Sequence, residues 1–115
     1  MNKNSTRYYS NKQEKRVAKT LNGKKQSNSG ATNFQKGDCI TDLFLLECKT
    51  KMKDSESFTI KKEWFTKNKE EAFAMGKLYN AVVIDFGDNE NHYIIDELLF
   101  KYLNNKLMEE ENYEN

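Results

Sequence analysis

The sequence has few of the residues on which disulfides and zinc sites depend. Its 115 residues include no proline, one histidine and two cysteines, Cys39 and Cys48. Two cysteines do not make a disulfide scaffold, and both fall in segments that we expect to be strands, so we expect small apolar side chains in a reducing compartment. Structural zinc takes four ligands, which these cysteines and the lone His92 cannot supply.

Long apolar runs are also missing. No stretch approaches the roughly 20 apolar residues that span a bilayer, so we expect no membrane partner. The N-terminal residues are polar, unlike a signal peptide, and we expect an intracellular protein. A length of 115 residues predicts one domain with one compact core.

What the chain does contain is charge, and it is unevenly distributed. Residues 1–36 hold nine Lys or Arg and one acid, a net charge of +8, whereas residues 37–115 carry a net charge of −7. A basic N-terminal segment is typical of proteins that meet polyanions, although it is equally typical of a merely solvated tail.

The first helix is expected to begin at Ser10, with Gln13 completing a capping box and Gly23 ending the helix. Residues 1–9 are then a flexible basic arm. Glu14 falls on the apolar stripe that includes Val17, and a carboxylate facing the core needs a partner. The alternative is a helix-start carboxylate that the macrodipole favours.

The central strand is expected over Leu43–Thr50, after a short strand at Asp38–Ile40 and a tight turn at Thr41–Asp42. A further short strand is possible near Lys25–Asn28. Side chains two apart in a strand share a face, so Glu47 and Lys49 should lie side by side. Because the central strand is apolar on both faces, it belongs in the middle of a sheet covered on both sides.

The second half continues with a helix capped by Thr59 and running to about Tyr79. A hairpin of strands follows, at Ala81–Phe86 and His92–Ile95, and then a last helix capped by Asp96. The predicted order αβββαββα indicates an α/β sandwich around a central mixed five-stranded sheet. We expect a single domain over residues 10–108 and a disordered acidic tail over 109–115.

An acid and a lysine held together at the end of an apolar strand are costly unless a ligand uses them. Together with Glu14 and Gly37-Asp38, the triplet Glu47-Cys48-Lys49 resembles the signature of the PD-(D/E)XK nuclease superfamily. Within it, the chain resembles the small Holliday-junction-resolvase-like proteins. The segment 28–32 before the aspartate adds to the resemblance, as does the segment 58–65, which looks like phage and bacterial members of this group. The likeness covers about residues 7–103, with Gly37 in place of the family's proline.

The resemblance implies a restriction-endonuclease-like three-layer sandwich and an Mg²⁺- or Mn²⁺-dependent hydrolase that leaves 5′-phosphate ends on DNA. Asp38 and Glu47 would bind the ion, with Glu14 as a further ligand and the main-chain carbonyl of Cys48 as another. Lys49 would orient or help deprotonate a water and stabilise developing charge. The cell would be bacterial, archaeal or phage-infected, and the location cytoplasmic.

Contact with DNA is expected mainly through its phosphates. The candidate residues are Arg7, Lys12, Lys15, Arg16, Lys19, Lys24, Lys25, Ser29, Thr32, Lys61 and Lys62. The last two lie where the second helix starts, a position that favours anions. Any single lysine among them is more often a solubilising charge than a phosphate contact.

The resemblance implies branched DNA, above all the four-way junction, as the substrate. It also implies a homodimer that makes two symmetric nicks, and the second or the last helix offers the surface for it. Other readings stay open. Asp42 is the rival of Asp38 as ligand, and Glu47 with Lys49 is also compatible with a surface ion pair of about 0–1 kcal/mol. The chain would otherwise be a nuclease for flaps, nicked DNA or duplex, an inactive DNA-binding module, or a protein adaptor.

Overall fold

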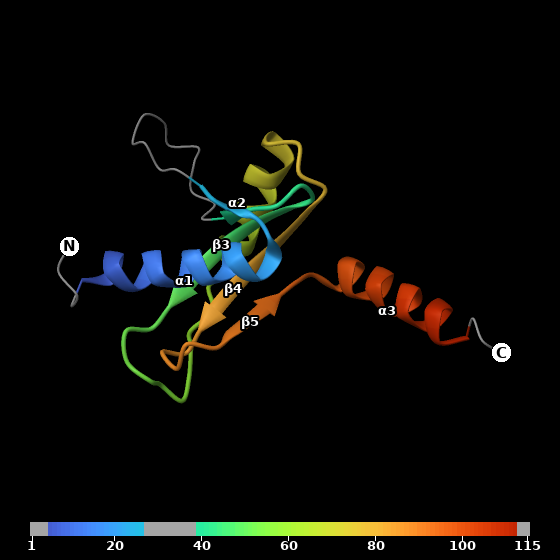
Figure 1. Cartoon of the computed structure of the whole chain (residues 1–115). Helices are drawn as coiled ribbons and strands as arrows, with labels where there is room; N and C mark the ends of the chain where they lie inside the picture. Colours follow the sequence, from blue (N-terminus) through green and yellow to red (C-terminus); the bar gives the residue numbers. More distant parts are fainter. Residues whose placement is uncertain (1–4, 27–38, 113–115) are drawn as a thin grey trace.

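The computed structural model describes residues 5–26 and 39–112. Its elements are α1 (Thr6–Leu21), β1 (Lys24–Lys25), β2 (Cys39–Ile40), β3 (Phe44–Thr50), α2 (Lys62–Ala74), β4 (Tyr79–Asp85), β5 (Asn91–Ile94) and α3 (Glu97–Asn112) (Figure 1). Within the described residues, the predicted order of helices and strands is confirmed. None of the helices in these two ranges is both long enough and apolar enough to cross a bilayer.

The five strands form one mixed sheet whose spatial order follows the sequence, from β1 at one edge to β5 at the other. β3 and β4 are parallel, and all other neighbours are antiparallel. The turn between β2 and β3 is closed by the Thr41 amide, which donates to the Phe44 carbonyl at 3.0 Å, and by the Thr41 hydroxyl, which accepts from the Phe44 amide at 2.9 Å. The predicted tight turn and the central place of β3 are confirmed.

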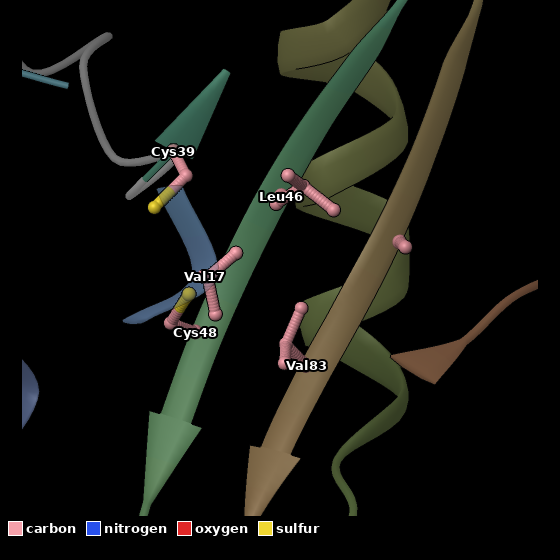
Figure 2. Close-up of a cluster of buried hydrophobic side chains, with 6 residues drawn as sticks. Val17, Cys39, Leu46, Cys48 and Val83 are labelled. Carbon is pink, nitrogen blue, oxygen red and sulfur yellow. The ribbon is translucent and has the colours of Figure 1, made fainter. Parts of the chain in front are cut away.

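Helices cover both faces of the sheet. On the α1 face, Val17 packs over Cys39, Leu46, Cys48 and Val83 in the core cluster that Figure 2 shows. On the α2 face, the buried Asn68 donates to the carbonyl of Leu45 and accepts from the side chain of Asn80. Each face of β3 therefore has its own helix, as a strand that is apolar on both faces requires.

The last helix departs from the predicted sandwich. Figure 1 shows α3 running away from the sheet rather than lying on it. Leu99 is buried near its start, but Phe100, Leu103 and Leu107 are 63%, 42% and 60% exposed. The prediction of α3 as a flanking helix is therefore wrong, because beyond Leu99 these apolar side chains stay exposed and the helix leaves the sheet. Its predicted cap is confirmed, since the Asp96 carboxylate accepts from the Leu99 amide at 2.8 Å.

The first helix begins earlier than its sequence predicts. Ser5, not Ser10, is the N-cap, and its hydroxyl accepts from the Tyr8 amide at 3.1 Å. The predicted capping box is wrong because Ser10 and Gln13 both lie inside the helix, where the Gln13 amide nitrogen donates hydrogen bonds to the strands. The predicted flexible arm over residues 1–9 is wrong for residues 6–9, which are helical. The helix ends at Asn22, which adopts the left-handed conformation that suits a C-cap.

Two other boundaries differ. The second helix starts at Lys62 rather than near Thr59, and it ends at Ala74, where Gly76 takes a φ of +72° and turns the chain into β4. The last helix continues to Asn112, so the predicted disordered tail is wrong for residues 109–112.

Candidate active site

Glu47 and Lys49 lie next to each other on the α2 face of β3. The alternation of the strand puts Leu46 and Cys48 in the core cluster on the α1 face, and therefore turns Glu47 and Lys49 to the other side. The Lys49 ammonium is 3.4 Å from a Glu47 carboxylate oxygen, and the two side chains are 33% and 14% exposed. The predicted neighbourhood of these residues is confirmed.

A tryptophan from α2 fixes the lysine from a second direction. The Lys49 ammonium lies 4.8 Å from the centre of the Trp64 ring, within the range of a cation–π contact. Trp64 itself packs edge-on against Phe58, with ring centres 6.2 Å apart. The ammonium of Lys49 is therefore held between a carboxylate on its own strand and an aromatic ring on the neighbouring helix.

An open cavity of about 240 Å³ lies at this place between β3 and α2. The residues that line it are Glu47, Lys49, Glu63, Trp64, Lys67 and Glu71. The helical members are spaced so that Glu63, Lys67 and Glu71 follow one another four residues apart on one side of α2. The cavity thus combines carboxylates, ammonium ions and one aromatic wall.

The donor set of this cavity suits a hard cation only in part. Carboxylate oxygens are the ligands that Mg²⁺ prefers, and Glu47 supplies one carboxylate beside Lys49. Within residues 5–26 and 39–112, no three histidine, cysteine, aspartate or glutamate side chains gather closely enough to hold a metal. A magnesium site here would therefore rest on one or two carboxylates and several waters, which is how Mg²⁺ is commonly bound.

Glu14 occupies the other face of the sheet. It is 8% exposed on α1, and its carboxylate lies 3.7 Å from the Lys25 ammonium. The alternative of a helix-start carboxylate is wrong, because the helix begins at Thr6 and Glu14 lies in its third turn. Its predicted burial is confirmed, whereas the structure does not bring it together with Glu47. Its role as a metal ligand stays a prediction.

The second predicted acid, Asp38, lies outside the described residues, as do Ser29 and Thr32. The described strand next to it does bear on the site. Cys39 is the register partner of Leu46, the residue that precedes Glu47. The rival ligand Asp42 is exposed in the turn between β2 and β3. The Cys48 side chain is 7% exposed in the core cluster, as predicted for a residue that would contribute only its main-chain carbonyl.

Two of the predicted DNA-binding cations are already paired with acids. Arg16 forms an ion pair with Asp85, a residue that is 1% exposed and also accepts from the amides of Gly87 and Asn89. Lys25 faces Glu14 and also donates to the side chain of Asn11 at 2.9 Å. Both cations thus have structural partners in addition to any role at a phosphate.

The remaining predicted cations are on the surface. Those that are exposed are Arg7, Lys12, Lys15, Lys19, Lys24, Lys61 and Lys62. Lys61 is the N-cap of α2 and makes no side-chain capping hydrogen bond, so the predicted position of this pair at a helix start is confirmed. Their contact with DNA stays a prediction.

Sequence reasoning missed two features around the site. The buried amide of Gln13 donates to the carbonyls of Lys49 and Val83, at 2.9 and 3.3 Å, and so ties α1 to the ends of β3 and β4. The contact of Trp64 with Lys49 joins α2 to the same strand. A single tryptophan in an amphipathic helix gives no signal of such a contact, because its partner is decided by how the helix crosses the sheet.

Comparisons of the chain with protein-family models, with curated proteins and with solved structures find no match.

Proposed function

We propose that the chain is a metal-dependent endonuclease that hydrolyses phosphodiester bonds in DNA, with branched DNA such as the four-way junction as its substrate. We also propose that the mixed sheet and its helices are a restriction-endonuclease-like fold. The observation that carries the endonuclease proposal is the placement of Glu47 and Lys49, 3.4 Å apart, on the wall of an open cavity between the central strand β3 and α2. A pair with a purely structural role has no need of a cavity.

The cation of this proposal is Mg²⁺ or Mn²⁺, held by Glu47 together with Asp38 and the main-chain carbonyl of Cys48. When bound, it would neutralise charge on the phosphate and lower the pKa of a coordinated water. Support comes from the chemistry of the donors, since all are oxygens. The pairing of Cys39 with Leu46 places β2 beside the strand that carries Glu47.

In this proposal Lys49 acts on the phosphate and on the attacking water. Its ammonium would donate hydrogen bonds to the oxygens on which negative charge develops. The carboxylate of Glu47 and the ring of Trp64 hold this ammonium before any substrate arrives, so little reorganisation is needed at the moment of reaction. Glu14 faces Lys25 on the α1 side of the sheet, and this proposal gives it no contact with Lys49 or the phosphate.

The proposed enzyme works as two copies, and α3 is the surface that we assign to their contact. The side chains of Phe100, Leu103 and Leu107 follow the spacing of a helical stripe, and each is more than 40% exposed. The last turn of α3 carries acids and no basic residue, which is unfavourable beside the carbonyl end of a helix.

The test is a cleavage panel with four-way junction, flap, nicked duplex, linear duplex and single strand, each with magnesium and with a chelator. We expect the wild-type chain to cut the four-way junction only with magnesium. Glu47→Gln and Lys49→Met should each lower the rate at least about 100-fold, because each removes a group aimed at the transition state. Matched exposed residues on α2 provide the controls, Glu70→Gln and Lys69→Met, which should cleave like wild type.

Each outcome of the panel has a distinct meaning. Preferential cutting of flaps, nicked DNA or duplex would keep the chemistry and replace the substrate. Binding of DNA without cleavage of any substrate would support an inactive DNA-binding module and overturn the enzyme. Cleavage that persists in chelator would overturn the metal-dependent mechanism.

A further inference from the structure

A second cavity adjoins the candidate site at the end of β3. It measures about 260 Å³, and its lining is Lys49, Thr50, Lys51, Phe58, Thr59 and Trp64. It shares Lys49 and Trp64 with the first cavity, so the two meet at the cation–π pair. None of the predicted site residues other than Lys49 belongs to it.

The two cavities have opposite charge. The first is lined by three glutamates and two lysines, whereas the described lining of the second has two lysines and no carboxylate. The acid-rich side suits a cation, and the acid-free side suits an anion. The ammonium of Lys49 lies at the boundary between them, within 3.4 Å of Glu47.

The two lysines of the basic cavity each contact an aromatic ring. The Lys51 ammonium lies 5.5 Å from the centre of the Phe58 ring, as the Lys49 ammonium lies 4.8 Å from that of Trp64. Phe58 packs edge-on against both Trp64 and Phe86, with ring centres 6.2 and 5.9 Å apart. Each lysine thus has its own aromatic ring, and the two rings are in contact.

The segment after β3 is tied to β4 on the same side. The Lys51 amide donates to the Asp85 carbonyl at 2.9 Å, and the Ser55 amide donates to the Phe86 carbonyl at 2.8 Å. Gly87 takes a φ of +99°, and a side chain there would collide with the main chain at Lys53. These contacts hold the main chain at Lys51 and Ser55 against β4 without any ligand, as a binding cavity that is formed in advance requires.

We infer that this basic cavity binds a backbone phosphate of the DNA strand next to the phosphate that is cut. The inference rests on the proposed endonuclease function and adds to it Lys51 and Thr59, two residues outside the predicted site. A phosphate seated between the Lys49 and Lys51 ammonium ions would place the neighbouring phosphodiester on the side of Glu47. The Thr59 hydroxyl supplies a donor at the rim, where its residue is exposed. The cavity is thus a subsite that holds a non-reacting phosphate, and Lys51 and Thr59 take no part in the chemical step.

The test measures how binding depends on salt, in the full chain that carries Glu47→Gln so that cleavage does not interfere. The probe is a fluorescein-labelled four-way junction. Its dissociation constant is measured at salt concentrations from about 50 to about 300 mM, a range in which counter-ion release changes the affinity for DNA. Lys51→Gln should reduce the log–log slope by about 0.9, the loss of one phosphate contact. Lys51→Arg, which keeps the charge and the contact with Phe58, should restore it.

The matched control is Lys53→Gln, an exposed lysine two residues further on that does not line the cavity. It should leave the slope unchanged. Equal losses from Lys51→Gln and Lys53→Gln would mean diffuse attraction only and would overturn the subsite. In the chain with Glu47 intact, Lys51→Gln should raise KM and leave kcat near the wild-type value. A slope that falls with Lys51→Gln in a chain that cuts no DNA would keep the subsite and reject the endonuclease.

Discussion

The ion pair of Glu47 and Lys49 can be tested directly for whether it contributes to the stability of the fold or to catalysis. The perturbation is the double substitution Glu47→Leu with Lys49→Met, which replaces two charged side chains by apolar ones of similar size. Leucine would continue the apolar face of β3, and methionine would lie over Trp64, where sulfur and an aromatic ring attract each other. If the pair serves catalysis, the fold should not need it.

The magnitude follows from the burial of the pair. Exposed pairs contribute about 0–1 kcal/mol, and breaking a fully buried pair costs about 3–5 kcal/mol. With side chains 14% and 33% exposed, this pair lies between these limits. We therefore expect Lys49→Met alone to lower the free energy of unfolding by about 1–3 kcal/mol. The double variant should be as stable as wild type or more stable by about 1–2 kcal/mol, because no charge remains to be desolvated.

The assay is urea denaturation followed by far-UV circular dichroism and by the fluorescence of Trp64, the one tryptophan of the chain. Equal slopes of free energy against urea in all variants would show that the midpoints report stability alone. A double variant less stable than wild type by more than about 2 kcal/mol would refute the reasoning, since the pair would then hold the fold together. Cleavage of DNA by the double variant would also refute the reasoning, because Glu47 and Lys49 would then not be needed for catalysis.

Three further expectations concern the rest of the molecule. Asp85→Ala leaves Arg16 without its acid and two amides without their acceptor, and should lower the free energy of unfolding by about 3–5 kcal/mol in urea denaturation. Gly87→Ala forces a side chain into a positive-φ position against the main chain, and should cost at least about 1–3 kcal/mol in the same assay. Leu103→Glu with Leu107→Glu should convert dimers to monomers in sedimentation while the helical circular dichroism is kept; dimers that persist would exclude α3 as the contact.

Local patterns were enough to predict the centre of the fold. β3 begins with apolar residues on both faces, Phe44 and Leu46 on one and Leu45 on the other, and this predicts a central strand with a helix on each side. The same alternation predicts that Glu47 and Lys49 lie side by side, and their separation of 3.4 Å agrees with it. These properties depend on residues within one strand, so no knowledge of the rest of the chain is needed.

The helix ends were harder because more than one residue offers a cap. Ser5 and Ser10 are both suitable N-caps by residue type, but in the structure the Ser5 hydroxyl accepts from the Tyr8 amide, and Gln13, inside the helix, donates to β3 and β4. At α2, Thr59 is a suitable cap by residue type, yet the preceding Phe58 packs between Trp64 and Phe86 and the helix begins later. In both places tertiary contacts override the local signal.

The candidate site likewise has one part that local sequence predicts and another that depends on tertiary contacts. Its part on β3 follows from the period of two, whereas Trp64, Phe58 and Lys51 join it only because α2 and the segment after β3 cross at one end of the sheet. The position of Glu14 shows the limit from the other direction. Its place on the buried stripe was predictable, but the ion pair with Lys25 on the α1 face was not, because it depends on where β1 is added to the sheet. The sequence of one strand therefore predicts the neighbourhood of Glu47 and Lys49. Whether Glu14 joins them depends on how α1 packs on the sheet, which the sequence of that strand does not determine.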